Sequence, residues 1–280
     1  MTDKTTVAIF GAAGSMGTRS SNALKNNLVY DVLYVEAGEE GMARLRERGV
    51  EPTEQSVALK QAEVIVLAVP DALIATVAAE IVPEMQSGAM LIGLDPAAPH
   101  AGRLPERQDV SYFFSHPSHP PIFNDETEAE ARRDFFGGVA KQSIVSALLQ
   151  GPEEDYAKGE VIASKLFGPI LRSHRISIEQ MAILEPALSE TVTATCLTVI
   201  REALDEAVKR GVPAEAARDF LLGHLNVELA ILFDEIDWEL SDGAKEAVAD
   251  AMSVIFQPDW KKVFDAEQLL VSTRKITEIK

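Results

Sequence analysis

Two histidines stand three residues apart in a proline-rich segment that follows an apolar run. The segment reads FFSHPSHPPIFND, covers residues 113–125, and contains His116 and His119. A neutral imidazole can accept the proton of a hydroxyl group, and it can also bind a divalent metal ion. His116 is therefore a candidate acid–base residue, and both histidines are candidate metal ligands. In the alternative interpretation the prolines stiffen the loop and a histidine only packs against it.

A glutamate in the second half of the chain has the chemistry to join these histidines. Glu185 lies in ILEPALSET, and with His116 and His119 it offers nitrogen and oxygen ligands for a divalent ion. Such an ion would polarise a hydroxyl group and the carbonyl that it becomes on oxidation. Glu185 is thus a second candidate catalytic residue and a third candidate ligand. Glu190 is expected to point elsewhere, roughly 140° around an α-helix, unless Pro186 changes the geometry.

A glycine-rich turn lies close to the N-terminus. In VAIFGAAGSMG the apolar run 7–10 predicts a buried strand, and a helix is expected from about Ser15 to Lys25. Glycines let the backbone approach a diphosphate closely, and the N-terminus of the following helix offers free N–H groups. The pattern predicts a dinucleotide site, with a purely structural turn as the alternative. The residues of this site would be Gly11, Ala12, Ala13, Gly14, Ser15, Met16 and Gly17.

Two further segments are expected to line the same dinucleotide. Glu36 closes the second apolar run 19 residues after Gly17, where a carboxylate can accept both ribose hydroxyls and repel a 2′-phosphate. This position favours NAD over NADP. A third apolar run ends in Val69, Pro70 and Asp71, which are expected at the carboxyl edge of the sheet, beside the cofactor. Asp71 could instead only cap the next helix.

The elements that must position these residues fall into two parts. Strand-like and helical segments alternate through residues 1–178, which predicts an α/β domain with a Rossmann-type, doubly wound parallel sheet. From residue 179 to 280 the pattern is helical, which predicts an all-helical substrate and dimerisation domain. Its apolar content is high for a lone surface layer, so we expect a homodimer.

The composition limits the classes of partner. The 280 residues carry a net charge of −18, which argues against a partner such as nucleic acid or an anionic membrane surface. An anionic small-molecule substrate remains compatible, because a few cations can reverse the field within a cleft. Cys196 is the single cysteine, so there is neither an internal disulfide nor a CxxC zinc pair. We expect a cytoplasmic protein, since the sequence predicts no signal peptide and no apolar stretch as long as a membrane span.

Several motifs carry a resemblance to known families. VAIFGAAGSMG, VIVLAVPD and REALDEAVKRGVPAEAARDFLLGHL resemble the 6-phosphogluconate and β-hydroxyacid dehydrogenase superfamily, whose members join an NAD(P)-binding domain to a helical domain. The SHP motif and the late strand–helix–strand unit resemble prephenate dehydrogenases. The SHPSHPPIFND loop together with EPALSET is similar to the apionate oxidoisomerase group. That resemblance implies NAD-dependent oxidation and rearrangement of a branched sugar acid, D-apionate, to 3-oxo-isoapionate.

One departure from the superfamily bears on the chemistry. β-Hydroxyacid dehydrogenases carry a lysine early in the long helix of the second domain, whereas this chain has ILEPALSET there. The usual lysine acid–base group is therefore absent, so either another group carries out the chemistry or the substrate is different. We expect an NAD-dependent oxidoreductase of carbohydrate metabolism that acts on an anionic sugar acid. The alternatives are a prephenate dehydrogenase-like or other β-hydroxyacid dehydrogenase, and an NAD-binding regulatory protein without chemistry.

Overall fold

The computed structural model describes residues 4–278, and the chain divides into two compact units. The first unit extends to Glu185 and takes up the chain again from Leu270, while the second unit is Pro186–Leu269. The division differs from the predicted boundary between residues 178 and 179. It lies inside a long helix, and the end of the chain returns to the first unit, which local sequence patterns do not indicate.

A seven-stranded sheet forms the centre of the first unit, in the order β2-β1-β3-β4-β5-β6-β7. Strands β1 to β5 are parallel, as predicted, but β6 is antiparallel to β5, and β7 is parallel to β6. The reversal arises because residues 118–141 form a loop that returns to the edge where β5 ends, without a crossover helix. The strands are β1 Thr5–Phe10, β2 Tyr30–Val35, β3 Val64–Leu67, β4 Met90–Gly93, β5 Ser111–Pro117, β6 Gln142–Gln150 and β7 Ile170–Arg175.

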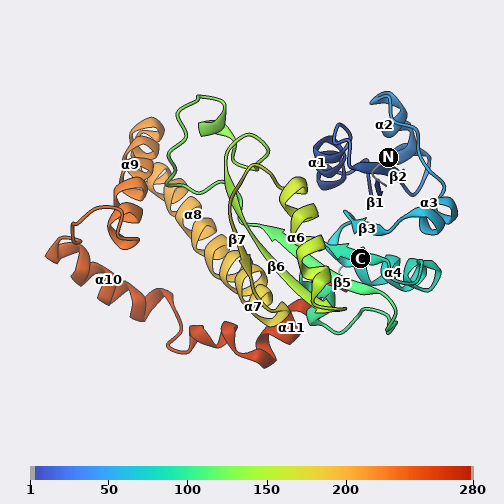
Figure 1. Cartoon of the computed structure of the whole chain (residues 1–280). Helices are drawn as coiled ribbons and strands as arrows, with labels where there is room; N and C mark the ends of the chain where they lie inside the picture. The colour runs from blue at the N-terminus through green and yellow to red at the C-terminus, as the bar shows by residue number, and fades with distance from the viewer. Residues whose placement is uncertain (1–3, 279–280) are drawn as a thin grey trace. The chain divides into compact units, whose positions relative to one another are not determined.

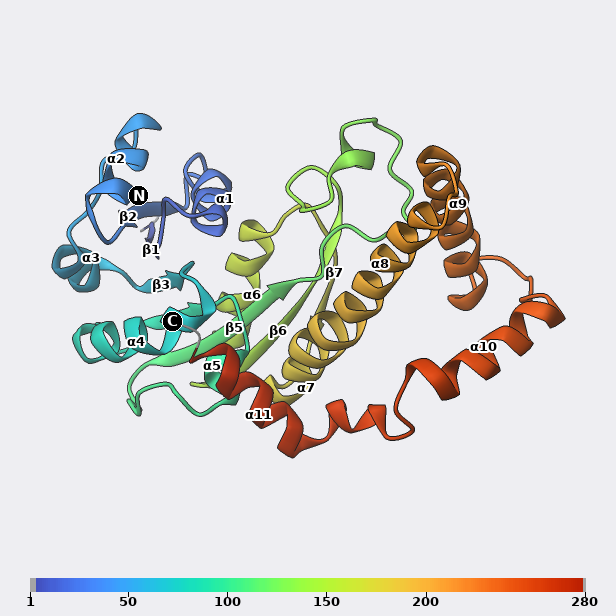
Figure 2. The same cartoon turned by 180° about the vertical axis from the view of Figure 1, so that it is seen from behind.

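Helices cover both faces of this sheet, which confirms the doubly wound α/β class (Figure 1, Figure 2). Alternate residues of each central strand belong to two separate cores: Ile65 and Leu67 pack with α3, α4, α5 and α7, whereas Val64 and Val66 pack with α1, α2 and α6. The helices are α1 Ser15–Leu24, α2 Glu39–Glu47, α3 Gln55–Gln61, α4 Asp71–Ile81, α5 Ala97–His100, α6 Glu154–Leu166 and α7 Ile178–Ala182.

The parallel strands bring four chain segments to one edge of the sheet. Strands β1, β3, β4 and β5 all end at that edge, because parallel neighbours share one direction. The glycine turn follows β1, Val69 and Asp71 follow β3, and His116 lies near the end of β5. The fold thus places the predicted dinucleotide site and the histidine loop along the same edge.

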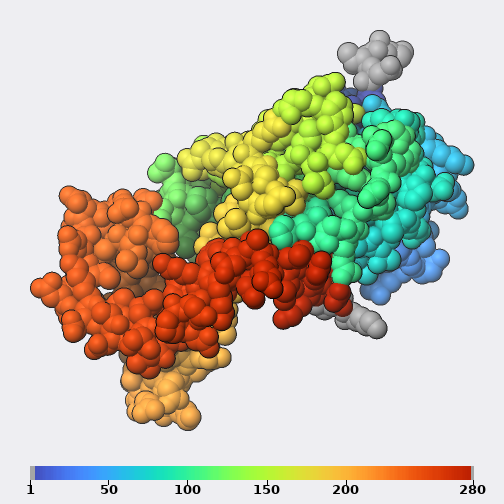
Figure 3. Space-filling model, turned by 90° about the horizontal axis from the view of Figure 1, so that it is seen from below, coloured from blue at the N-terminus to red at the C-terminus, as the bar shows by residue number. Residues whose placement is uncertain are grey.

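The last helix, α11 Ala266–Ile276, ends on the first unit. Its Thr273 is fully buried, and the Thr273 Oγ1 hydroxyl hydrogen bonds with Nδ1 of His100 at 3.1 Å. Arg103 also forms an ion pair with Glu278. In Figure 3 this helix is the red segment on the surface of the molecule. Long-range contacts such as these hold the end of the chain on the first unit.

The second unit is helical, as predicted, and packs sparsely. Its helices are α8 Thr195–Lys209, α9 Ala214–Leu232 and α10 Asp242–Ile255. Within the described chain, α8 and α10 bury none of their residues, and α9 buries only Ala217. The large apolar side chains that remain exposed include Leu197, Val199, Phe220, Leu232, Phe233, Trp238, Val254 and Ile255.

One continuous helix, Ile178–Lys209, combines α7, a π-helical stretch and α8. Pro186 lies inside the π-helical stretch Ile183–Ala194 and does not break the helix. Residues five apart are hydrogen-bonded in a π-helix and lie on about the same face. The divergence expected for Glu185 and Glu190 on an α-helix therefore does not apply.

The same helix is long and apolar enough to cross a membrane, judged by length and composition alone, which corrects the expectation that no stretch reaches that length. Only 11% of its most apolar window is buried within the chain. Such an exposed apolar face marks an interaction surface, and the sequence by itself does not show which molecule binds there.

Candidate active site

The three glycines of the turn have different steric roles. Gly11 has φ +79°, and a Cβ there would lie 2.5 Å from the Ala68 carbonyl oxygen. A Cβ on Gly17 would lie 2.0 Å from the Gly11 carbonyl oxygen, so both positions require glycine for packing within the fold. A Cβ on Gly14 would approach no described atom closer than 3.4 Å. The bare backbone at Gly14 is therefore free to serve a bound molecule.

Helix α1 begins directly after this turn with an open N-terminus. Gly14 is its N-cap, and no side chain in the described residues caps the helix. The first turn also contains no acidic residue. Free N–H groups and the positive end of the helix dipole bind anions such as a diphosphate. Gly11 to Gly17 therefore fit a dinucleotide diphosphate.

Glu36 lies against the glycine turn, as the sequence predicts. Its Oε2 accepts a hydrogen bond from the Ala13 N–H at 2.8 Å, and its Oε1 accepts one from the Ala37 N–H at 3.2 Å. Gly41 makes room for this carboxylate, because a Cβ there would lie 2.2 Å from Cγ of Glu36. The carboxylate is thus held at the end of β2, beside the turn, where a ribose would be recognised.

Arg48 also stabilises the glycine turn, which the sequence did not indicate. Its Nη1 donates hydrogen bonds to the Ala12 carbonyl at 3.2 Å and to Thr18 Oγ1 at 2.9 Å. Arg48 follows α2, far from Ala12 in the sequence, so no local pattern joins the two. Only the packing of α2 against the turn brings them together.

The segment after β3 connects the glycine turn to the histidine loop. Val69 lies beside Gly11, where its Cγ1 would be 3.1 Å from an added Cβ. Pro70 is the N-cap position of α4, and no side chain in the described residues caps this helix, so Asp71 does not act as its cap. Partial desolvation raises the pKa of Asp71, and charge on His116 opposes that rise. Asp71 thus lies within electrostatic reach of His116.

His116 and Glu185 come together from distant parts of the sequence. His116 Nε2 and Glu185 Oε1 are 3.8 Å apart, and both side chains are about four-fifths buried, with 19% and 23% exposed. Nδ1 of His116 lies 2.9 Å from the Pro117 carbonyl and must donate to it, which leaves Nε2 as the acceptor. Burial lowers the pKa of His116 to about 4, so the imidazole is neutral at physiological pH.

The carboxyl group of Glu185 is also shifted by its surroundings. Burial raises the pKa of Glu185, Asp71 raises it further, and charge on His119 opposes the rise. Asp71, His116, His119 and Glu185 are therefore one electrostatic cluster at the carboxyl edge of the sheet. The sequence predicted all four as site residues, although it assigned Asp71 to the cofactor.

His119 is held by the loop rather than by this pair. Its φ is +59°, an uncommon value for a residue other than glycine. Its Nδ1 lies 2.9 Å from the Phe136 carbonyl, and its ring lies 5.3 Å from the Phe136 ring. The rings of His116 and His119 are 6.3 Å apart in an edge-on arrangement.

The predicted three-ligand metal site is not assembled in this arrangement. No group of three or more His, Cys, Asp or Glu side chains among residues 4–278 could hold a metal ion. His116 Nε2 and Glu185 Oε1 fit as two ligands of one ion, because they lie 3.8 Å apart and neither atom forms a short hydrogen bond within the described part of the chain. His119 does not join them, because its ring centroid lies 6.3 Å from that of His116 and its Nδ1 is held at the Phe136 carbonyl.

Burial of His116 makes the stability of the fold depend on pH in a definite window. The pKa of this imidazole is about 4 in the folded chain, against 6.5 for an ordinary histidine. Between these values the unfolded chain binds a proton that the folded chain does not, so the free energy of unfolding falls as the pH drops through the window. The free energy of unfolding should fall by about 3 kcal/mol as the pH drops across this window. Above the window His116 should make no pH-dependent contribution to stability.

Urea denaturation across this pH range, with a chelator present, tests the prediction for the wild type and for His116→Asn. The variant should lose this part of the acid sensitivity, because Asn does not titrate. His174→Asn, at an exposed position of β7, should behave as the wild type does. Equal acid sensitivity in the wild type and His116→Asn would contradict the buried, neutral imidazole.

The fold and the site together define a dinucleotide-binding dehydrogenase with a helical C-terminal unit. A family model described as "Acetohydroxy acid isomeroreductase, NADPH-binding domain" matches residues 1–120, and one described as "Phosphogluconate dehydrogenase (decarboxylating) C-term" matches residues 124–277. A D-apionate oxidoisomerase of Cupriavidus necator is 52% identical over 98% of this chain and 100% of the relative. One of Rhizobium rhizogenes is 50% identical with the same coverage. The chain belongs to the D-apionate oxidoisomerase family.

Solved structures agree with this placement. A Cupriavidus necator protein described as a semialdehyde dehydrogenase NAD-binding protein, in complex with calcium and NAD, matches with a TM-score of 0.95 and 51% identity, covering 98% of this chain and 100% of that chain. An NADH-preferring ketol-acid reductoisomerase from an uncultured archean matches with a TM-score of 0.67 at 16% identity, covering 98% and 82%. The second likeness concerns the fold alone. The predicted relation to the apionate oxidoisomerase group is confirmed.

Proposed function

We propose that this chain oxidises D-apionate with NAD and rearranges the carbon skeleton to give 3-oxo-isoapionate. The observation that carries the proposal is full-length similarity to four D-apionate oxidoisomerases, at 36–52% identity over at least 95% of the chain. The site supports it, because the dinucleotide turn and the proton-transfer cluster lie along one edge of the sheet. An oxidation by hydride transfer needs both.

The cofactor proposal is NAD rather than NADP. When bound, NAD accepts a hydride from the hydroxyl-bearing carbon of the substrate. The chain supplies the N–H groups of the glycine turn for the diphosphate and the Glu36 carboxylate for the adenosine ribose. A carboxylate at that position repels the additional phosphate of NADP. The NAD bound by the Cupriavidus necator relative supports this choice.

Proton transfer is proposed for the cluster of His116, Asp71 and Glu185. Oxidation releases the hydroxyl proton, and the neutral Nε2 of His116 is the acceptor that burial keeps available. The rearrangement then moves a carbon substituent onto the new carbonyl carbon. In that step the neighbouring hydroxyl loses a proton and the former carbonyl oxygen gains one, so no net proton is consumed. Glu185, whose pKa is raised, is placed to carry this proton between the two oxygens.

We also propose a divalent ion at this pair. His116 Nε2 and Glu185 Oε1 would hold it, with the remaining positions filled by the substrate. When bound, such an ion stabilises negative charge on the substrate oxygens. Asp71 would then accept the hydroxyl proton in place of His116, because Nε2 has one lone pair. The calcium in the Cupriavidus necator relative supports a cation in this family.

Removal of divalent ions should therefore lower turnover of D-apionate at least tenfold, a typical scale for loss of a charge-stabilising group. The measurement is the initial rate after dialysis against EDTA, followed by addition of Mg²⁺, Mn²⁺ or Ca²⁺. The affinity for NAD, measured by calorimetry, should not change, because the glycine turn holds the dinucleotide without the ion. Full activity in EDTA would assign Nε2 of His116 to proton transfer and remove the ion from the proposal.

The function itself is tested by incubating the purified protein with D-apionate and NAD. NADH should form, and the carbon spectrum of the product should show a ketone and a rearranged skeleton. Prephenate and an unbranched aldonate are the comparison substrates, and NADP is the comparison cofactor. Binding of NAD without turnover of any of them would favour the regulatory alternative. NADH formation with prephenate and not with D-apionate would overturn the proposal.

We propose a homodimer in which a second copy of the chain covers the exposed apolar face of the helical unit. We also propose that the enzyme is cytoplasmic. Helices α8 and α10 bury none of their residues in the described chain, yet Leu197 is 54% exposed and Val254 is 83% exposed. A second copy offers the same apolar surface, so a symmetric contact would cover both. The same contact would also bury the apolar side chains of the helix Ile178–Lys209, so this helix would not need to lie in a membrane.

The wild type should therefore sediment at twice the chain mass of 30.4 kDa without detergent. Leu197→Arg should shift it toward the monomer, because an arginine cannot be buried without a partner in an apolar contact. Glu202→Arg, at an exposed polar position of the same helix, is the control and should leave the dimer intact. A wild-type monomer, or a requirement for detergent, would contradict the proposal.

A further inference from the structure

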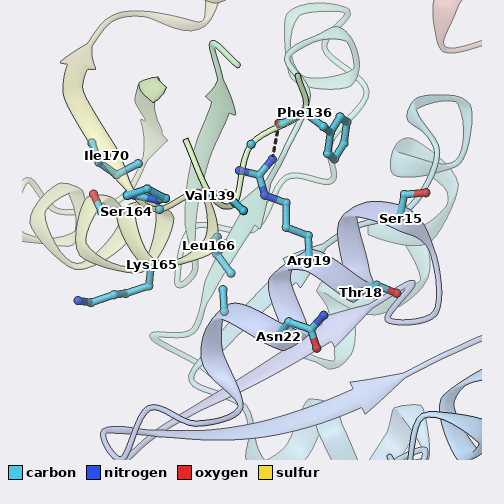
Figure 4. Close-up of a pocket in the computed structure, with 15 residues that line it drawn as sticks. Ser15, Thr18, Arg19, Asn22, Phe136, Val139, Ser164, Lys165, Leu166 and Ile170 are labelled. Atoms are coloured by element: carbon cyan, nitrogen blue, oxygen red, sulfur yellow. Dashed lines mark hydrogen bonds between the residues drawn. The ribbon is translucent and has the colours of Figure 1, made fainter. Parts of the chain in front are cut away.

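Arg19 connects the dinucleotide helix α1 to the loop that carries His119. Its Nη1 donates a hydrogen bond to the Phe136 carbonyl at 3.0 Å, and its Nη2 donates to the Phe167 carbonyl at 3.2 Å. The guanidinium also lies over the rings of Phe136 and Phe167, at 5.4 and 5.6 Å from their centroids. Figure 4 shows Arg19 extending from α1 toward Phe136 within a groove of about 950 Å³. Arg19 is thus fixed by four contacts, two of them with Phe136.

The loop segment that Arg19 contacts is itself a rigid turn. Asp134 accepts hydrogen bonds from the N–H groups of Phe136, Gly137, Val139 and Ala140, at 3.3, 2.7, 2.8 and 2.9 Å. Gly137 has φ +102°, and a Cβ there would lie 2.5 Å from Nε2 of Gln142 and 2.7 Å from Nη2 of Arg19. A glycine at this position lets the turn rest directly on the guanidinium. Arg19 therefore contacts this turn at Phe136 and lies directly beside Gly137.

The same carbonyl that accepts from Arg19 also accepts from His119. Nδ1 of His119 lies 2.9 Å from the Phe136 oxygen, so Nδ1 carries the proton and Nε2 is left as the acceptor. His119 also has the strained backbone φ of +59°, which persists only where neighbouring contacts hold it. Two donors from distant parts of the chain thus meet at one oxygen.

We propose that Arg19 is a positioning residue, which holds Phe136 and through it fixes the place and the tautomer of His119. The inference deepens the proposed function, because it gives His119 its role beside His116 and Glu185. Arginine suits this position better than lysine, since a planar fork can donate to two carbonyls while its delocalised charge lies near two aromatic rings. Arg19 itself need not touch the substrate or the dinucleotide.

The experiment compares Arg19→Met, Arg19→Lys and a control, Arg44→Met, in the full-length protein. Arg44 lies on α2 and pairs only with Glu40 at the surface, among the contacts described. Nitrogen-15 spectra of the histidines report the tautomer of His119, and amide hydrogen exchange reports the turn 134–140. Neither readout requires turnover. Calorimetry gives the affinity for NAD, and initial rates with D-apionate give kcat and KM.

Arg19→Met should mix the tautomers of His119, speed exchange at Gly137, Val139 and Ala140, and lower kcat by roughly tenfold to a hundredfold, the scale of a small misplacement in a site. Affinity for NAD should stay within about twofold, because α1 keeps its N-terminus. Arg19→Lys should recover part of the effect, and Arg44→Met should match the wild type. Gly137→Ala should reproduce the changes from the loop side, and it replaces Arg19→Met if that variant does not fold.

An unchanged His119 tautomer and unchanged exchange in Arg19→Met would overturn the inference, whatever the substrate proves to be. Altered spectra with no activity on D-apionate in the wild type would instead overturn the proposed function and leave the positioning role standing. A purely structural role would lower the unfolding midpoint and leave the tautomer of the folded protein unchanged, which also overturns the inference.

Discussion

His116→Asn should lower kcat for D-apionate by about a hundredfold to ten-thousandfold, with the affinity for NAD unchanged. The asparagine amide can still donate to the Pro117 carbonyl, as Nδ1 does at 2.9 Å, so the end of β5 keeps its hydrogen bond. It offers no equivalent of Nε2, the atom that lies 3.8 Å from Glu185. The variant therefore removes the reactive nitrogen and little else.

The measurement combines NADH formation with calorimetric binding of NAD. His174→Asn is the matched control, because His174 is exposed on β7 and lies outside the cluster. Its rate should equal that of the wild type. A His116→Asn variant that retains more than about a tenth of the wild-type kcat would remove His116 from the chemistry, since general acid–base groups contribute at least a hundredfold. The proposed reaction would then need another acceptor.

Substitutions in the glycine turn should give the second large effect. Two of them distinguish a role in folding from a role in NAD binding. Gly17→Ala places a Cβ at 2.0 Å from the Gly11 carbonyl oxygen, which is backbone and cannot move aside easily. We expect it to destabilise the fold by about 3 kcal/mol or more. Gly14→Ala meets no described atom closer than 3.4 Å, so the fold should keep its stability.

Gly14→Ala should nevertheless weaken NAD binding by at least tenfold, because the methyl group would occupy the side of the turn that we propose faces the diphosphate. Urea denaturation and calorimetry give the two quantities for each variant. Gly223→Ala is the control: it lies within α9 with no described atom within 4 Å of the added Cβ, so it should stabilise the protein slightly and leave NAD binding unchanged. NAD binding by Gly14→Ala at wild-type strength would show that the turn has no dinucleotide role.

The part of the site that we propose for the dinucleotide could be located from the sequence because its determinants are local. Gly11, Gly14 and Gly17 follow an apolar strand and open a helix within one short stretch, and Glu36 closes the next strand. Backbone conformation and hydrophobic periodicity fix such a unit before any distant contact forms. The doubly wound class followed from the same alternation of strands and helices.

The reactive half depends on contacts between distant residues. The residue types of His116, His119 and Glu185 indicated proton transfer or metal binding. The pairing of His116 with Glu185 exists only because the long helix begins with α7, which packs against β6, the neighbour of β5. The partly desolvated environment that lowers the pKa of His116 and raises that of Glu185 is likewise a property of the packed core. No spacing in the sequence could have revealed it.

The sequence by itself determined the class of the fold and the position of the glycine-rich turn, because both depend on residues that are neighbours along the chain. It also supplied the types of the chemically active side chains, but not their arrangement. Only the tertiary structure decided that β6 runs against β5, that the final helix returns to the first unit, and that Arg19 and His119 meet at the Phe136 carbonyl. These arrangements depend on how side chains fill space between segments far apart in sequence, which local periodicity does not specify.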